Sequence, residues 1–259
     1  MSSSVLFEVK HGVASLALNR PDKLNAFNRE MALELQKKLD DCAGDPAIRC
    51  IYLTGNGKAF SAGQDLSEVT GPEMQGFDKM LSEHYNPIIT RIRKIEKPVL
   101  AAVNGVAAGA GANIALCCDI VVATHSASFI QAFSKIGLIP DSGGTYFLPR
   151  LIGWQKASAL MMLGDKVSAQ EAERLGMIYK VFADDEFVAS ARNIAEILAQ
   201  MPTKGLALTK QALNSSFTNS LESQLSVENE IQQLAAKTYD CNEGIKAFIE
   251  KRKPIFKGE

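Results

Sequence analysis

Apolar and polar residues alternate at the start of the chain, which is the pattern of a two-stranded hairpin. Two alternating runs in "VLFEVKHGVASLALN" (residues 5–19) flank the dipeptide His11-Gly12, which suits the turn between antiparallel strands. Four later runs are short, mainly apolar and bounded by turn residues, as expected of buried strands. They lie at residues 48–55, 97–105, 119–124 and 176–182.

The segment between the hairpin and the first buried run has helical spacing. In "NREMALELQKKLDDC", Met31, Leu35 and Leu39 recur every four residues and would share one face of a helix. Asn28 precedes them and is a suitable N-cap. Helical patterns also lie between the other apolar runs. Strands that alternate with helices favour crossover connections, so the pattern predicts an α/β fold with a mainly parallel sheet.

The pattern changes after Met201-Pro202. Residues 204–256 show only helical spacing, and a segment this short needs another surface to fold against. We therefore expect a body at residues 1–202 and a helical region at 203–259 that packs on the body or on a neighbouring subunit. Residues 67–79 contain two glycines and a proline in a weak pattern, and they are expected to form a mobile loop.

Composition excludes several classes of protein. The formal net charge is −1, so no general basic field favours nucleic acid. No apolar run approaches the ~20 residues of a membrane span, and no secretory signal is visible. The five cysteines include no C-x-x-C pair, which predicts free thiols in a reducing, cytoplasmic setting and no zinc site. They are Cys42, Cys50, Cys117, Cys118 and Cys241.

Two glycine-containing turns follow successive predicted strands. The first, "GKAFSAGQDL" (residues 57–66), places small residues around Gly63, and the second, at residues 104–119, contains Gly105, Gly109 and Gly111. Such turns let the backbone approach a ligand closely. Side by side, they would aim two amides at one oxygen, an oxyanion hole worth ~3–4 kcal/mol per donor. The alternative is that these glycines serve only tight helix–sheet packing; neither turn matches a dinucleotide or Walker A motif.

Asp141 is a single carboxylate in the apolar stretch "KIGLIPDSGGTYFLPRLIG" (residues 135–153). An Asp between Pro and Ser-Gly is a good turn residue and a possible cap for the helix expected near Thr145. The functional alternative is a general acid/base. Burial among apolar neighbours would raise its pKa toward working pH. The expected neighbours are Phe129, Ile130, Phe133 and Ile139.

Six segments together resemble the enoyl-CoA hydratase/isomerase (crotonase) family nearly from end to end, in matching order and spacing. They are "RPDKLNAF", "GKAFSAGQDL", "AAVNGVAAGAGANIALCCDIVVAT", "GLIPDSGGTYFLPRLIG", "LGDKVSAQEAERLGMIYKVF" and "AFIEKRKPIFKG". The resemblance implies a crotonase (ClpP-like) spiral of ββα units with a C-terminal helical trimerisation region. It also implies a trimer or a dimer of trimers that acts on acyl-CoA thioesters without a metal or redox cofactor.

The resemblance also implies roles for particular residues. The backbone amides of Gln64 and Ala110 would hold the thioester oxygen. Hydratases of the family carry two glutamates, which match Asn113 and Phe133 here, so efficient hydration is not expected. The family's dienoyl-CoA isomerases carry an aspartate at the position of Asp141, and the surrounding phrase resembles bacterial isomerases of ring 1,2-epoxyphenylacetyl-CoA, an intermediate of phenylacetate degradation. Asp141 would then be the sole acid/base.

Other positions would line the path of the acyl-CoA. "RPDKLNAF" resembles the adenine and pantetheine segment, and "FIEKRKPIFK" resembles a tail that reaches the CoA of a neighbouring subunit. Their basic residues have the alternative of being ordinary exposed charges. The residues that the resemblance assigns to the substrate and CoA are Lys23, Leu24, Ala26, Ala62, Gly63, Asp65, Leu66, Gly109, Phe133, Phe248 and Lys251.

Three functions remain open at this point. The favoured one is isomerisation of an unsaturated or ring-epoxide acyl-CoA. The second is an aliphatic Δ3,Δ2-enoyl-CoA isomerase with weak hydratase activity. The third is a non-catalytic protein that binds acyl-CoA or RNA, and the near-neutral charge argues against RNA.

Overall fold

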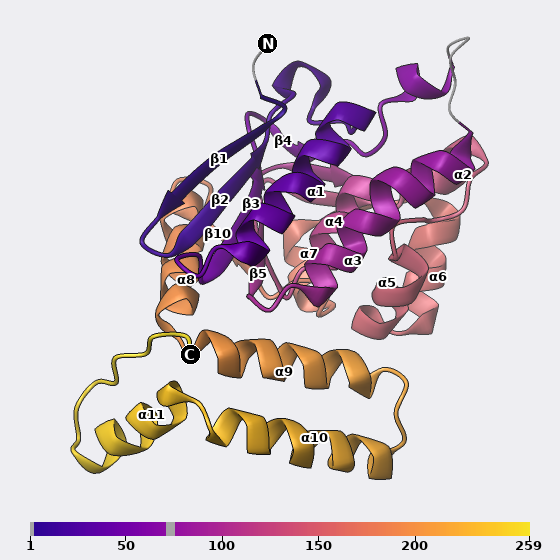
Figure 1. Cartoon of the computed structure of the whole chain (residues 1–259). Helices are drawn as coiled ribbons and strands as arrows, with labels where there is room; N and C mark the ends of the chain where they lie inside the picture. Colours follow the sequence, from indigo (N-terminus) through magenta and orange to yellow (C-terminus); the bar gives the residue numbers. More distant parts are fainter. Residues whose placement is uncertain (1–2, 71–75) are drawn as a thin grey trace.

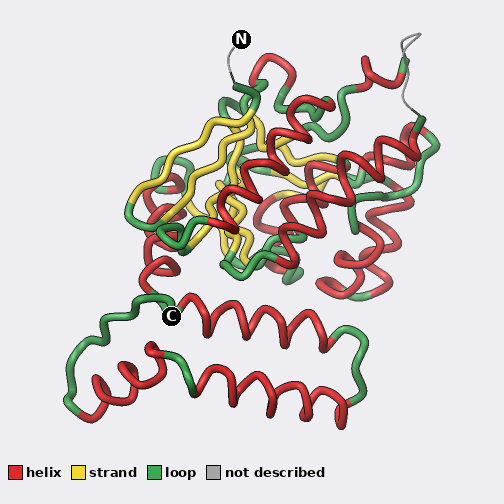
Figure 2. Tube along the Cα trace, viewed as in Figure 1, coloured by secondary structure: helices red, strands yellow, loops and turns green. Residues whose placement is uncertain are grey.

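The computed structural model describes residues 3–70 and 76–259, and its strands form two sheets surrounded by helices (Figure 1, Figure 2). In the larger sheet the strand order is β1-β2-β3-β5-β7-β10. β1 and β2 are antiparallel and the other neighbours are parallel, so the predicted hairpin and parallel sheet are confirmed. The bounds are β1 Val5–Lys10, β2 Val13–Leu18, β3 Cys50–Gly55, β5 Val99–Val103, β7 Ile120–Thr124 and β10 Lys180–Phe182.

The smaller sheet has the order β4-β6-β8-β9 and was not predicted from periodicity. Its strands have three residues each, too few to show alternation. β4 and β6 run parallel, so their carboxyl ends lie at the same edge and the two glycine turns leave the sheet side by side. The bounds are β4 Ala59–Ser61, β6 Val106–Ala108, β8 Ser128–Ile130 and β9 Lys166–Ser168.

The larger sheet is buried on both faces. Along β3, Ile51 and Leu53 enter one core cluster, and Cys50 and Tyr52 enter the other, as strand alternation requires. Helix α8 (Phe187–Gln200) covers the second cluster. The first is covered by α1 (Arg29–Gly44), α3 (Asn86–Lys94) and α4 (Ala110–Leu116). The predicted cap of α1 is confirmed, because the Asn28 side chain accepts a hydrogen bond from Met31 N at 3.0 Å.

Shorter helices complete the body. Both ends of the expected mobile loop at residues 67–79 are helical: residues 67–69 belong to the 3-10 helix η2 and residues 77–79 form α2, while residues 71–75 lie outside the described residues. None of the helices in the described ranges is long and apolar enough to span a bilayer. The α-helices are α2 Phe77–Lys79, α5 Gly144–Ile152, α6 Trp154–Leu163 and α7 Ala169–Arg174; the 3-10 helices are η1 Pro21–Lys23, η2 Leu66–Val69 and η4 Ala132–Ile136; η3 Met80–Tyr85 is a π-helix.

The C-terminal region forms a helical layer beside the body (Figure 1). It consists of α9 (Thr203–Ser216), α10 (Leu221–Ala236) and α11 (Tyr239–Ile249), and residues 203–259, all of them described, contain no strand. The last residues return to the start of α9, where Arg49 Nη1 donates to the Phe256 carbonyl at 2.8 Å. The predicted all-helical character of this region is therefore confirmed.

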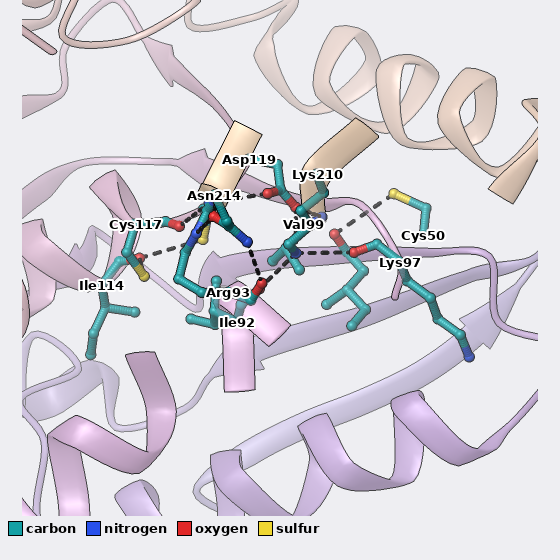
Figure 3. Close-up of polar contacts among 12 residues, drawn as sticks. Cys50, Ile92, Arg93, Lys97, Val99, Ile114, Cys117, Asp119, Lys210 and Asn214 are labelled. Carbon is teal, nitrogen blue, oxygen red and sulfur yellow. Dashed lines mark hydrogen bonds and ion pairs between the residues drawn. The ribbon is translucent and has the colours of Figure 1, made fainter. Parts of the chain in front are cut away.

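A buried polar network fastens α9 to the body (Figure 3). Lys210 is only 6% exposed, and its Nζ lies 2.7 Å from Asp119 Oδ2 and donates to the Ile92 carbonyl at 2.6 Å. Arg93 Nη1 lies 3.1 Å from the other Asp119 oxygen. Burial lowers the pKa of Lys210, and the charge of Asp119 opposes that effect. Removal of one partner would leave a buried charge uncompensated, which is strongly destabilising.

Candidate active site

The first turn leaves the peptide N–H of Gln64 directed away from its neighbouring segment. Phe27 N donates to the Gly63 carbonyl at 2.7 Å, and Asp65 N donates to the Phe27 carbonyl at 2.8 Å. These bonds form an isolated parallel bridge between Phe27 and Gln64. Peptide groups alternate in direction along extended backbone. Because the bridge uses the Gly63 carbonyl and the Asp65 N–H on either side of Gln64, the Gln64 N–H points to the opposite side.

The second turn brings another free amide to the same place. Ala110 is the first residue of α4, so its N–H has no acceptor within the helix. A Cβ atom on Gly63 would lie only 3.4 Å from the Ala110 nitrogen and 2.8 Å from the Ala108 carbonyl oxygen. Only glycine permits this approach, and Gly63 also has a φ of +90°. The two turns are therefore in direct contact.

Asp141 lies between η4 and α5, and its main chain makes the turn. The Asp141 carbonyl accepts hydrogen bonds from Gly144 N and from Asn113 Nδ2, both at 2.8 Å. Ser142 (φ 51°) and Gly143 (φ 76°) both have left-handed backbone and lead into α5. The N-cap of α5 is Gly143, with no side-chain cap. The alternative in which the Asp141 carboxylate caps this helix is therefore wrong.

The Asp141 carboxylate is in an environment that favours its protonated form. Burial raises the pKa of Asp141, and a hydrogen bond from Ser142 Oγ to Oδ1, at 2.8 Å, partly opposes the rise. A carboxyl group with a raised pKa can take and return a proton near neutral pH more readily than an ordinary aspartate.

Both turns and Asp141 border one mainly apolar cavity of about 510 Å³. Asp141 is the only carboxylate among the lining residues that the structure describes. In the described part of the chain, no three His, Cys, Asp or Glu side chains are grouped as metal ligands. The lining residues are Ala62, Gly63, Gln64, Leu66, Thr70, Phe77, Met80, Gly109, Ala110, Ala132, Phe133, Lys135, Ile136, Leu138 and Asp141.

The expected apolar neighbours of Asp141 need correction. Phe133 lines the cavity, but Phe129 is fully buried in the core, and Ile139 is 80% exposed. Ile130 lies in β8 and is not part of the cavity lining. Proximity in sequence was misleading because Phe129 and Ile130 belong to strand β8, whereas Phe133 lies in η4 and Ile139 follows that helix. Phe77, Met80 and Leu138, which sequence reasoning missed, provide the apolar wall instead.

The two positions at which the family's hydratases carry glutamates have different surroundings. Phe133 presents an aromatic side chain to the cavity. Asn113 is 1% exposed; its Oδ1 accepts from Gln131 Nε2 at 2.8 Å, and its Nδ2 donates to the Asp141 carbonyl. Asn113 therefore supports the turn that carries Asp141 and is not among the cavity-lining residues.

The segment expected to line the CoA path supports the first turn. Lys23 and Leu24 are exposed and Ala26 is buried, and the Leu24 carbonyl accepts from Ala62 N at 2.9 Å. The Asp65 carboxylate lies 2.8 Å from Arg20 Nη2. Burial alone would raise the pKa of Asp65. Hydrogen bonds from Ser67 and Arg20 nevertheless hold that pKa below its usual value.

The other two expected CoA contacts lie outside the cavity of their own chain. Phe248 is 85% exposed on α11, and Lys251 is exposed just after that helix. Figure 1 shows α11 at the end of the C-terminal layer that lies away from α5 and α6. The structure therefore does not bring these residues together with Gln64, Ala110 and Asp141 within one chain.

The chain is similar to known proteins over nearly its whole length. The profile of the enoyl-CoA hydratase/isomerase family matches residues 8–259. The chain is 47% identical to 1,2-epoxyphenylacetyl-CoA isomerase of Escherichia coli K12, over all of both proteins. It is 36% identical to 2,3-dehydroadipyl-CoA hydratase of the same organism, over 99% of both. The crystal structure of an enoyl-CoA hydratase from Bacillus anthracis superposes with a TM-score of 0.91 at 33% identity, covering 99% of this chain and all of that one.

The match in structure extends through the spiral body and the C-terminal helices, so the predicted crotonase fold is confirmed. The chain belongs to the enoyl-CoA hydratase/isomerase family.

Proposed function

We propose that this isomerase uses Asp141 as its only acid/base and the peptide amides of Gln64 and Ala110 as an oxyanion hole for an acyl-CoA thioester. One observation carries the proposal: a single carboxylate with a raised pKa borders the same cavity as the two contacting turns. Asn113 and Phe133 supply no second carboxylate there. One such group suffices to move a proton, whereas hydration also requires activation of water.

In this mechanism, Asp141 removes a proton from a carbon of the acyl group and becomes a carboxylic acid. The electron pair moves toward the thioester, whose oxygen gains negative charge between the two amides. Asp141 then returns the proton to a different carbon, and the double bond shifts. Atoms and electrons balance, and no resident metal or redox cofactor is needed. Each amide contributes by stabilising charge that is larger in the transition state than in the substrate.

The proposed substrate is the ring 1,2-epoxide of phenylacetyl-CoA. In its rearrangement the bond between the two epoxide carbons would break as the ring double bonds shift, which gives a seven-membered ring that contains the oxygen. Asp141 would move a proton from the CH2 group beside the thioester to a ring carbon, so no atom is gained or lost. The similarity to the Escherichia coli isomerase supports this choice. So does the size of the apolar cavity, about 510 Å³, because an apolar cavity of ~150 Å³ already holds a benzene ring. The remaining volume would hold the thioester and the start of the pantetheine arm.

A substrate panel tests the proposed function. The enzyme would be incubated with the ring epoxide of phenylacetyl-CoA, a 3-enoyl-CoA and a 2-enoyl-CoA in deuterated water, and the products followed by mass spectrometry. We expect fastest conversion of the ring epoxide and little hydration of the 2-enoyl-CoA. Faster conversion of the 3-enoyl-CoA would instead identify an aliphatic enoyl-CoA isomerase. Binding without conversion of any of them would refute the isomerase assignment.

We also propose that the enzyme assembles into a trimer or a dimer of trimers. Phe248 and Lys251 would then contact the CoA of a neighbouring subunit, while Lys23, Leu24 and Ala26 contact the CoA within the same chain. The C-terminal helices support this proposal because they expose several large apolar side chains. These are Leu213, Leu221, Leu225, Leu234, Ile245, Phe248 and Ile249. Light scattering that gives a monomer mass would contradict the assembly.

A reducing compartment, the cytoplasm, is the proposed location. All five cysteines are free thiols, and four of them are buried. Burial raises the pKa of the Cys42 thiol to about 11, which keeps it protonated and unreactive at neutral pH.

A further inference from the structure

The side chain of Gln64 is held on both of its polar atoms. The Tyr85 hydroxyl donates to Gln64 Oε1 at 2.6 Å. Gln64 Nε2 donates to the Asp65 carbonyl at 3.2 Å and to Glu68 Oε2 at 3.3 Å. A glutamine beside an apolar cavity is thereby fixed in one orientation, and its peptide group is fixed with it.

Tyr85 also supports the backbone bridge that directs the Gln64 N–H. It is 1% exposed and lies at the end of π-helix η3, and its ring packs edge-on against Phe27 with 5.9 Å between ring centroids. Phe27 is the residue that pairs with Gln64 in the bridge. The π-helical turn thus contacts the first turn twice, once through a hydrogen bond and once through an aromatic pair; such turns are frequent at functional sites.

The Tyr85 hydroxyl keeps its proton over the whole working range of pH. Burial raises the pKa of Tyr85 well above its usual value, and the charges of Asp141 and Glu68 raise it further. Tyr85 is therefore a permanent hydrogen-bond donor.

We propose that Tyr85 is a positioning residue that aims the Gln64 peptide N–H at the thioester oxygen by holding the Gln64 side chain. This inference rests on the proposed function, because it assumes that the Gln64 amide is half of the oxyanion hole. Loss of a complete oxyanion donor costs ~10²–10³-fold in kcat. An amide that remains but is misaligned should cost part of that, about 10- to 100-fold.

Tyr85→Phe tests the proposal because it removes one hydroxyl oxygen and keeps the ring against Phe27. We expect kcat to fall 10- to 100-fold while KM changes by less than about threefold. Tyr52→Phe is the matched control, since Tyr52 is also buried but belongs to the core cluster beneath α8. Its kcat should equal that of the wild type.

A double-mutant cycle with Gln64→Leu tests the route of the effect. The leucine keeps the peptide N–H but cannot accept a hydrogen bond from Tyr85. If Tyr85 acts through the Gln64 side chain, then Tyr85→Phe should lower kcat by less than about twofold in the Gln64→Leu background. A full additional loss in the double variant would overturn the proposal, as would wild-type kcat in Tyr85→Phe.

An infrared measurement gives a readout that a purely structural role would not change. Phenylacetyl-CoA labelled at its thioester carbonyl would be bound to each protein. Two aligned donors lower the carbonyl stretching frequency, and Tyr85→Phe should return it partly toward the value in water, with Tyr52→Phe unchanged. An identical frequency in wild type and Tyr85→Phe would refute the proposal. Failure of the proposed function would give a different result from failure of the Tyr85 proposal. The wild-type enzyme would itself show no isomerisation.

Discussion

Replacement of Asp141 by asparagine is the most direct trial of the mechanism. The amide has nearly the same size, and its oxygen can still accept the hydrogen bond that Ser142 Oγ donates at 2.8 Å. It cannot take a proton from carbon. General acid–base catalysis contributes ~10²–10⁴-fold, and Asp141 is the sole carboxylate among the described lining residues. Since Asp141 would act first as base and then as acid, we expect kcat to fall by at least about 10³-fold, with KM within about threefold.

The same substitution should not reduce stability. Burial raises the pKa of Asp141, so the folded protein binds this proton more tightly than the unfolded chain. The ionised side chain therefore costs folding free energy above the ordinary aspartate pKa, and the cost is complete once the pH exceeds the folded-state pKa. Asparagine removes that cost. At neutral pH we expect a thermal midpoint equal to or above that of the wild type.

The two measurements together separate a catalytic role from a structural one. Single-turnover conversion of the preferred acyl-CoA would be followed by chromatography, and unfolding by calorimetry. Asp185→Asn is the control, because Asp185 is exposed and lies outside the cavity. Asp141→Asn with a rate within threefold of wild type would refute Asp141 as the base. A lower thermal midpoint together with a proportional loss of activity would show instead that Asp141 is needed for folding.

Three further predictions address pH, the second amide and the C-terminal region. The rate constant kcat/KM should rise with pH as Asp141 loses its proton. Ser142→Ala should move the midpoint of this rise to higher pH, because it removes a hydrogen bond that stabilises the carboxylate. An unchanged midpoint would contradict this prediction. Ala110→Gly should be mild, but Ala110→Pro, which deletes the N–H at a helix position that tolerates proline, should lower kcat by about 10²–10³-fold; equal small effects would exclude this amide. Lys210→Met should lower the free energy of unfolding, measured in urea, by about 3–5 kcal/mol. Lys204→Met, which removes an exposed ion pair, should change it by less than about 1 kcal/mol. Similar losses in the two variants would contradict the anchoring role of Lys210.

Local pattern predicted the long elements of this fold correctly. The hairpin, the cap of α1 at Asn28 and the strands β3, β5 and β7 follow from alternation, capping and apolar runs within the elements themselves. The short strands of the smaller sheet do not, because three residues carry no periodicity. They matter for the site, since the parallel pair β4 and β6 sets the two turns side by side.

The candidate site also contains residues that could be predicted from the sequence and residues that could not. The two turns and Asp141 were singled out from local motifs, because glycine turns and a carboxylate in an apolar stretch are visible in a single chain. The choice of Gln64 and Ala110 within those turns came from the resemblance to the family. The role of Ile139 was predicted wrongly, and Met80 and Tyr85 were missed. A sequence pattern reports which face of its own element is buried. Which distant faces meet around the cavity is decided by packing between elements, and only the tertiary structure contains those contacts.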